Sequence, residues 1–520
     1  MNVYAAATRP YDNAWVIIEP AVSGLQCKDT WNSDSCTEGK KRFIESLKYV
    51  QLRNEDHYKG LHEMLSQFPE SMRIFYLSIS PSLYENIAAT INRVARPKDA
   101  ALRVVFEKPF GKDLMSAVTL SELLSAHLRE DEILRVDHYL GKSGMQALLD
   151  FRRINYDLLL SLGFPSAEIP VSGRDSSGLT TVSVVMAEQE QTAGRTMYYD
   201  QFGVVRDVMQ NHLTQAVVYT LMHLQSGSPN SSGFGDLTDR LDVLRRLKYS
   251  RQFHNGCIPV HERESTGSLW LGQYSTYLTH LKEDIMDGIR RGLISPSRNE
   301  DITSITPTAA RVEFILRDKI KEEQGIKVLV SAGKALSERE MFVEVQAQHG
   351  CGVKYGVQGG IHKHYPGNRS TDRGPYILLE GACWENLGSD EVRLPYGWEA
   401  DPEACVLPFQ TTSFDKEDDK VNHSVSNAQD SCPGPSVSKT CILRPSEYYA
   451  KDTEIKSNST TYRYNAYVDI IGALLKEDRS YFVTTEELHA QWALWDGVLS
   501  DSLCTSIELY DVGWGGLYYG

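Results

Sequence analysis

The feature that most constrains the fold is an alternation of short apolar strands and helical stretches between residues 72 and 140. Three apolar runs, MRIFYLSISPS, LRVVFEKPFG and ILRVDHYLG, end in Pro, Gly or polar residues, and stretches with helical spacing separate them. This order is typical of a doubly wound parallel sheet with right-handed crossovers. Ligands of such sheets bind at the carboxyl ends of the strands, where Lys108 and the segment Asp137–Lys142 lie.

The pattern changes after about residue 150. GLTTVSVVMAEQ is β-branched and alternating, FGVVRDVMQNHLTQAVVYTLMHL is a long apolar helix, and ARVEFILRD and KVLVSAGKALSEREMFVEVQAQ are typical of antiparallel strands. We therefore expect an α/β coenzyme domain over residues 1–140 and an α+β domain for substrate binding and dimerisation over residues 141–520. The charged, Ser/Asn/Pro-rich segment Phe414–Val437 predicts a disordered insertion.

Charge and cysteine usage narrow the class of protein. A net charge of −15 over 520 residues argues against nucleic-acid or anionic-membrane partners, so that a local group of cations is a candidate anion site. The sequence has no run of about 18 apolar residues and no secretory signal pattern at its start. Nine scattered cysteines, an odd number, predict free thiols and a cytoplasmic location.

Four stretches carry residues suited to chemistry, and each has a plain structural alternative. Lys108 precedes a proline at a strand end and could be an exposed lysine beside a turn. Asp137–Lys142 places an acid, an imidazole, a phenol and an ammonium group within six positions, and could be a solvated turn. His212 lies on an apolar helix and could be a core histidine, while Lys334 and Arg339 lie in a strand-to-turn stretch.

Taken together, these stretches resemble the glucose-6-phosphate dehydrogenase family. The matching motifs are EKPFG at Glu107–Gly111, RVDHYLGK at Arg135–Lys142, YYDQFGVVRDVMQNH at Tyr198–His212, LGQY at Leu271–Tyr274 and GKALSER at Gly333–Arg339. They follow the family's order, cover about residues 43–346, and the resemblance returns at RSYFVTTEELHAQW. The resemblance implies a Rossmann-like coenzyme domain followed by a large domain of antiparallel sheet and helices.

The resemblance also implies an activity and a set of site residues. The activity is oxidation of glucose 6-phosphate to 6-phosphogluconolactone with hydride transfer to NADP, the first step of the pentose phosphate pathway, in a homodimer or homotetramer. His212 would be the base and Asp137 the carboxylate that orients it, a pairing that suits proton abstraction at neutral pH. The implied substrate ligands are Lys108, His138, Tyr139, Lys142, Glu188, Asp207, Lys334 and Arg339. The implied coenzyme contacts are Lys108, Thr8 and Arg9.

The coenzyme half of the sequence departs from the family pattern. No Gly-rich turn of the GASGDLA type occurs here, and GWGGLYYG near the carboxyl end lacks the strand-to-helix context. We therefore expect that the chain starts one βα unit late and that its coenzyme sheet lacks a central strand. An alternative function follows from this departure, namely a non-catalytic, dehydrogenase-like subunit that binds the sugar phosphate but has a defective coenzyme site.

Two smaller expectations concern other ligands. Ser331 and Glu340 stand where some family members use cations to hold a structural NADP, so we expect that second site to be absent or altered. The stretch His254–His261, with His254, Cys257 and His261, has metal-binding residue types but no recognisable fourth ligand, and His362–His364 is expected to be solvated. No metal is predicted.

Overall fold

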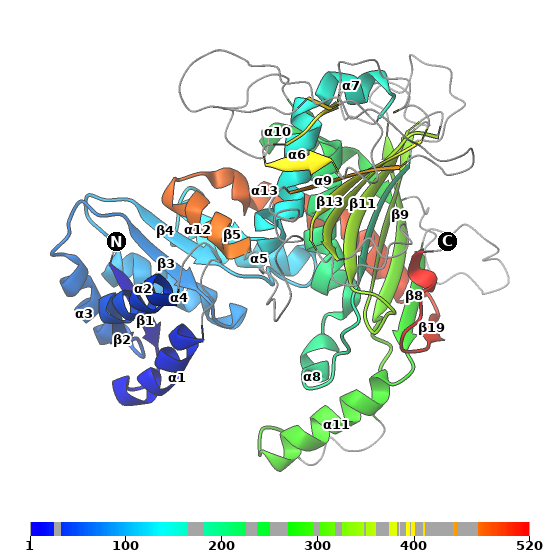
Figure 1. Cartoon of the computed structure of the whole chain (residues 1–520). Coiled ribbons are helices and arrows are strands. Elements are labelled where there is room, and N and C mark those ends of the chain that lie inside the picture. The colour runs from blue at the N-terminus through cyan, green and yellow to red at the C-terminus, as the bar shows by residue number, and fades with distance from the viewer. Residues whose placement is uncertain are drawn as a thin grey trace. The chain divides into compact units, whose positions relative to one another are not determined.

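In the computed structural model, the chain forms two compact units (Figure 1). Unit 1 comprises Met1–Phe110, Val118–Val136 and Lys456–Tyr464, and unit 2 comprises Gly111–Ala117, Asp137–Ile455 and Asn465–Gly520. The structure describes residues 2–24, 33–164, 181–224, 237–249, 269–295, 302–317, 325–347, 350–359, 374–381, 384, 392–395, 397–400, 409–410, 440–445 and 466–518. The predicted insertion at Phe414–Val437 and the histidines at 254, 261 and 362–364 lie outside these ranges.

Unit 1 contains the predicted alternation of parallel strands and helices. Its strands are β1 (Val3–Ala7), β2 (Leu47–Gln51), β3 (Arg73–Leu77), β4 (Leu102–Phe106) and β5 (Ile133–Val136). Its helices are α1 (Tyr11–Ser23), α2 (Ser33–Ser46), α3 (Glu55–Leu65) and α4 (Tyr84–Thr90), with α5 (Leu114–Ser125) spanning the boundary between the units. Strand β1 pairs with β2, and β4 pairs with both β3 and β5, all in parallel. Within the described part of unit 1, β1 and β3 do not pair, so the strands form two separate sheets.

Burial explains why β4 lies between two neighbours. Val104, Val105 and Phe106 are each fully buried, as expected for a parallel strand covered on both faces. The ring of Tyr84, at the start of α4, meets Phe106 edge-on at a centroid distance of 5.0 Å. The Tyr84 hydroxyl donates to the carbonyl of Glu107 at 2.6 Å, which fixes the chain just beyond the end of β4.

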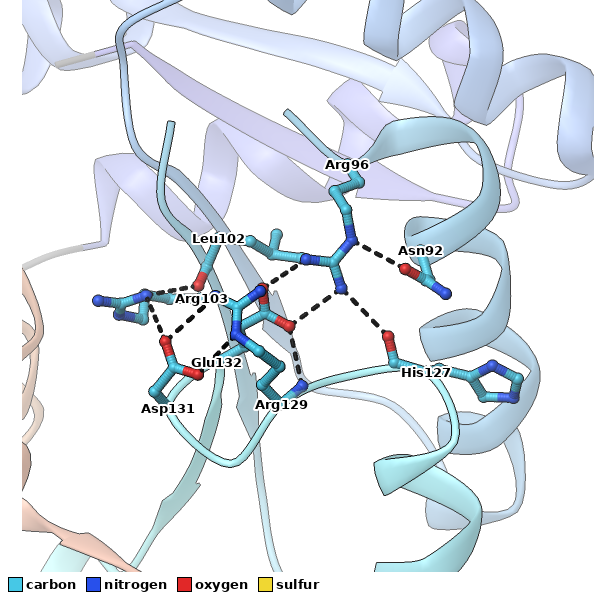
Figure 2. Close-up of polar contacts among 8 residues, drawn as sticks. All are labelled: Asn92, Arg96, Leu102, Arg103, His127, Arg129, Asp131 and Glu132. Atoms are coloured by element: carbon cyan, nitrogen blue, oxygen red, sulfur yellow. Dashed lines mark hydrogen bonds and ion pairs between the residues drawn. The ribbon is translucent and has the colours of Figure 1, made fainter. Parts of the chain in front are cut away.

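A buried carboxylate joins the two turns that precede β4 and β5 (Figure 2). Glu132 is 1% exposed and accepts from Arg96 Nη2 at 3.0 Å and from the backbone N–H of Arg129 at 2.9 Å. Arg96 also donates to Asn92 and to the carbonyl of His127. Burial raises the pKa of Glu132, but the hydrogen bonds from Arg96 and Arg129 outweigh it and hold the pKa below its ordinary value.

Unit 2 is built on one large, mostly antiparallel sheet, as predicted for an α+β domain. The strand order is β15 (Trp398–Ala400), β17 (Thr440–Pro445), β13 (Tyr376–Glu380), β12 (Gly352–Gly359), β11 (Glu340–Gln346), β6 (Thr181–Ala187), β10 (Gly325–Gly333), β9 (Ala309–Arg317), β8 (Leu269–Tyr274) and β19 (Ile507–Tyr510). Strand β7 (Leu247–Tyr249) also pairs with β9. Two pairs, β6 with β10 and β8 with β19, run parallel.

The helices of unit 2 bury one face of this sheet in a continuous apolar core (Figure 1). They are α6 (Ser143–Ile154), α7 (Tyr156–Ser161), α9 (Thr214–Leu221), α10 (Leu237–Arg246) and α13 (Thr485–Ser502). A π-helix over Val205–Leu213 runs directly into α9. The remaining helices of this unit include α8 (Thr196–Tyr199), α11 (Tyr277–Arg290) and α12 (Ala466–Leu475).

The described cysteines differ from the expectation of free thiols. Cys36, Cys351, Cys441 and Cys504 are each disulfide-bonded, so that expectation is wrong for these four. The number and spacing of cysteines do not determine whether or how they pair. Among the described helices, none is long and apolar enough to cross a membrane.

Loss of the Glu132 carboxylate is expected to destabilise unit 1. Glu132→Gln removes the charge that compensates the partly exposed Arg96 and weakens the hydrogen bonds to a buried group, which is expected to cost about 1–3 kcal/mol. Hydrogen–deuterium exchange of the full chain should show weaker protection of β4 and β5. The matched control is Asp131→Asn, because the Asp131 side chain is 53% exposed and its surface ion pair contributes under about 1 kcal/mol. Equal protection in both variants would contradict the prediction.

Candidate functional site

The site begins at Asp137, the residue that follows β5 in the chain. Asp137 caps a single 3-10 turn, His138–Gly141, and its Oδ1 accepts from the backbone N–H of Tyr139 at 3.0 Å. The same oxygen accepts from Nδ1 of His212 at 2.5 Å. Both side chains are buried, with Asp137 4% and His212 1% exposed. The structure therefore joins two residues that lie 75 positions apart.

The backbone conformation around His212 explains how its imidazole reaches Asp137. His212 lies in the π-helix Val205–Leu213, in which N–H groups bond to carbonyls five residues earlier. Asp207 precedes His212 by five residues, so this spacing places both on one side of the helix. The Asn211 side chain donates to the carbonyls of Arg206 and Asp207, at 3.1 and 3.3 Å, and so stabilises the widened turn.

Aromatic rings enclose the imidazole of His212. The ring of Tyr139 stacks on it at a centroid distance of 4.2 Å and an interplanar angle of 27°. The ring of His138 meets it edge-on at 4.6 Å and 79°. Because the carboxylate of Asp137 is the acceptor, Nδ1 of His212 carries the proton and Nε2 is the basic nitrogen. The arrangement can take a proton at Nε2 and stabilise the resulting imidazolium.

The turn after Asp137 also gathers donors for an anion. Lys142 Nζ lies 4.4 Å from the centre of the Tyr139 ring. Burial and the like charge of Arg339 lower the pKa of Lys142 to about 8. Burial and the nearby carboxylates of Glu188 and Asp137 raise the pKa of Tyr139, so its hydroxyl stays protonated. An entering anion would meet a cation and neutral donors.

The start of α12 packs closely against the His138–Gly141 turn. A Cβ on Gly141 would lie 2.1 Å from the carbonyl oxygen of Ala466, at the start of α12, so only glycine fits there. The next residue, Tyr467, stacks on His138 at 6.0 Å with nearly parallel rings. The sequence reasoning missed Tyr467, although it lies shortly before the returning motif RSYFVTTEELHAQW.

A second group of charges lies at the carboxyl ends of two parallel strands. In the register of β6 and β10, Ala187 lies opposite Gly333, so the next residues, Glu188 and Lys334, emerge side by side. Lys334 Nζ is 2.5 Å from Glu188 Oε2 and 3.6 Å from Asp207 Oδ2. Lys334 is 2% exposed, whereas the carboxylates remain about one quarter exposed. Ammonium and carboxylate groups so arranged suit the hydroxyls of a sugar.

Tyr199 completes this group and was also missed. Its buried ring lies 5.5 Å from Lys334 Nζ, and the carboxylate of Asp207 adds to the effect of burial in raising the Tyr199 pKa. The signal was present, because Tyr199 belongs to the motif YYDQFGVVRDVMQNH. Arg339 lies nearby at the surface and pairs with Glu190 at 2.8 Å.

The other predicted residues lie in unit 1 or form different contacts. Lys108 follows β4, and Thr8 and Arg9 are exposed just after β1, where Gln51 and Tyr49 donate to their carbonyls at 2.9 and 2.5 Å. In unit 2, Glu340 accepts from the Tyr376 hydroxyl at 2.7 Å and pairs with Lys354. Ser331 is buried within β10. An absent or altered second NADP site stays a prediction.

Both parts of the chain match models of one protein family. The model described as glucose-6-phosphate dehydrogenase, NAD binding domain, matches residues 6–147. The model described as glucose-6-phosphate dehydrogenase, C-terminal domain, matches residues 175–355. Together they cover most of the chain and include every residue predicted for the site.

Curated relatives extend the similarity. The human GDH/6PGL endoplasmic bifunctional protein is 28% identical over 517 residues, which cover 98% of this chain and 56% of that protein. Glucose-6-phosphate 1-dehydrogenase of Emericella nidulans is 30% identical over 64% of this chain and 57% of that protein. The chain thus spans about half the length of these relatives.

A solved structure supports the fold. It is glucose-6-phosphate dehydrogenase in complex with its substrate glucose-6-phosphate, which aligns with a TM-score of 0.64 at 20% identity. The alignment covers 99% of this chain and 87% of that one.

Anion binding at the His138–Lys142 turn is expected to weaken as pH rises. Lys142 is protonated below pH about 8 and neutral above it, so sulfate, which stays dianionic, should bind roughly tenfold more weakly at pH 9.5 than at 7.5. Isothermal titration calorimetry measures this change. Lys142→Met should bind weakly at both pH values. A wild-type affinity that does not change with pH would rule out Lys142 as an anion ligand.

Proposed function

The chain belongs to the glucose-6-phosphate dehydrogenase family, and on this premise we propose that it oxidises glucose 6-phosphate at C1 to 6-phosphogluconolactone, using NADP. The observation that carries the proposal is the buried pair formed by Asp137 and His212 at 2.5 Å. This oxidation needs a base with a fixed tautomer, and Asp137 fixes the tautomer of His212 beside the His138–Lys142 turn.

His212 acts as the general base in this proposal. Its Nε2 takes the proton of the C1 hydroxyl, and Asp137 holds the ring orientation through Nδ1 and stabilises the imidazolium that forms. The stacked ring of Tyr139 excludes water from one face of the imidazole. The coenzyme, when bound, supplies the acceptor for the hydride that leaves C1.

The phosphate and the sugar are held at different places. His138, Tyr139 and Lys142 bind the phosphate, because they supply donors and positive charge close to the base. Glu188 and Asp207 accept hydrogen bonds from the sugar hydroxyls while Lys334 neutralises them. Arg339 adds positive charge beside the phosphate ligands, and Lys108 contacts both substrate and coenzyme.

The residues after β1 fit one end of the coenzyme. Thr8 and Arg9 are exposed at the carboxyl end of a parallel strand, and their carbonyls are held by β2 side chains. A hydroxyl and a guanidinium at that position suit the 2′-phosphate that distinguishes NADP from NAD. We propose that these two residues, with Lys108, provide the coenzyme contacts. Self-association into a homodimer or homotetramer is part of the same proposal.

A second candidate is a non-catalytic subunit that binds the sugar phosphate. It is favoured by one observation: apart from Lys108, the residues proposed to bind the sugar phosphate lie in unit 2, whereas the proposed coenzyme contacts lie in unit 1. Purified protein that binds glucose 6-phosphate but forms no NADPH would support this candidate over the dehydrogenase.

Replacing the base tests the dehydrogenase directly. His212→Asn should lower kcat for glucose-6-phosphate-dependent NADPH formation by about 10²- to 10⁴-fold, because general base catalysis contributes that much. The control is His280→Asn on α11, which alters a histidine bonded to Tyr274 and should keep nearly full activity. A loss of only a few-fold in His212→Asn would contradict its role as the base.

The observations that bear on the cellular compartment of the protein disagree. The cysteine count predicted the cytoplasm, whereas four described cysteines are disulfide-bonded, which is typical of oxidising compartments. The human relative that aligns over 98% of this chain is named an endoplasmic protein. We propose that the disulfides favour an oxidising compartment over the cytoplasm.

Alkylation under non-reducing conditions tests this proposal. Cys36, Cys351, Cys441 and Cys504 of protein isolated from its native source should resist iodoacetamide and react only after reduction, because disulfide sulfurs are not nucleophilic thiolates. Peptide mass spectrometry counts the modified cysteines, and a fully reduced, unfolded sample is the control. Complete alkylation without reductant would favour the cytoplasm.

A further inference from the structure

A buried hydrogen-bond relay lies at the end of the π-helix that carries His212. The indole N–H of Trp495, on α13, donates to the Thr214 hydroxyl at 2.8 Å. That hydroxyl donates in turn to the carbonyl of Met209 at 2.8 Å. Trp495 is fully buried and Thr214 is 2% exposed, so water does not substitute for either bond.

The relay marks the point at which the helix changes its hydrogen bonding. The backbone N–H of Thr214 reaches the carbonyl of Met209, five residues earlier, and α9 begins at Thr214. The Met209 carbonyl thus receives both the backbone and the side chain of the same threonine. π-helical turns are rare, occur mostly as short segments and are frequent at functional sites. The role of a contact that stabilises the wide turn at this junction is therefore of interest.

The position of His212 depends on this register. His212 precedes Thr214 by two residues, and a slip of one residue in helical register would rotate a side chain by about 100° around the axis. Such a rotation would carry Nδ1 of His212 away from Oδ1 of Asp137, to which it is bonded at 2.5 Å.

We propose that Thr214 and Trp495 are positioning residues, which hold the π-helical register so that His212 meets Asp137. The inference deepens the proposed function, because it rests on His212 being the base. Neither is one of the residues proposed to contact substrate or coenzyme. The Trp495 ring also packs edge-on against Phe314 at 5.1 Å, so a role in packing is the competing explanation and must be separated from the role of the N–H.

Three variants separate the hydrogen bonds from the packing. Thr214→Val keeps the shape of the side chain and removes both bonds of the hydroxyl, whereas Thr214→Ser keeps the hydroxyl. Trp495→Phe keeps an aromatic ring against Phe314 and removes the N–H. Each is made in the full chain and compared with wild type by kinetics and by proton NMR. The NMR signal is that of the Nδ1–H proton of His212, which a short bond to a carboxylate shifts far downfield.

Thr214→Val is expected to lower kcat by about tenfold or more while the KM for glucose 6-phosphate changes less than about twofold, because a misplaced base harms the chemical step. Its downfield His212 signal should weaken or disappear. Thr214→Ser should behave as wild type, and Trp495→Phe should fall between them. Adding Trp495→Phe to Thr214→Val should cause no further loss, since both act through one hydroxyl.

Other outcomes would overturn the inference. If Thr214→Val or Trp495→Phe lowers the melting temperature but leaves kcat and the downfield signal unchanged, the relay only supports packing. If Thr214→Val does not fold, Trp495→Phe and Thr214→Ser decide the question by the same two measurements. A wild type that shows the downfield signal but forms no NADPH would refute the proposed function, while the NMR comparison would still test the positioning role.

Discussion

The hydrogen bond between Asp137 and His212 is the contact on which the site depends. Each member lies on irregular backbone, Asp137 as the cap of a 3-10 turn and His212 within a π-helix. Irregular turns of these kinds recur at functional sites because they aim side chains in directions that regular helices do not offer. Here they bring two buried side chains within 2.5 Å although 75 positions separate them in the chain.

Two lysines of the site, Lys142 and Lys334, have different charged neighbours. Near Lys142 lie the neutral Tyr139 and a second cation, Arg339, which pairs with Glu190. The cation Lys334, by contrast, already has two carboxylate neighbours, Glu188 and Asp207. In the proposed function, the phosphate of the substrate would therefore bind near Lys142, and the sugar hydroxyls would bind near Lys334. This difference has added weight in a chain whose net charge is −15.

Local patterns were sufficient for β4 and β5, which were predicted from the apolar runs that end at EKPFG and DHYLGK. The pairing of Asp137 with His212 is a tertiary contact, and only the motif resemblance implied it. Other tertiary contacts could not be predicted from the sequence. Glu188 meets Lys334 because β6 and β10 run parallel, a pairing of strands more than 100 residues apart. The apolar pattern of Val205–Leu213 does not distinguish a π-helix from an α-helix, and the Trp495–Thr214 bond joins residues 281 positions apart. The disulfide bonds of four described cysteines were also missed, because cysteine number and spacing do not determine pairing.

The contact between Gly141 and Ala466 has a consequence for how the site comes into being. The turn that carries His138 and Lys142 is held by α12, which is synthesised more than 300 residues later. A nascent chain emerging from the ribosome therefore carries both Asp137 and His212 long before α12, which packs against this turn, has been synthesised. Contacts this distant in sequence form late and slowly, so the turn reaches its final conformation only after α12 has been synthesised.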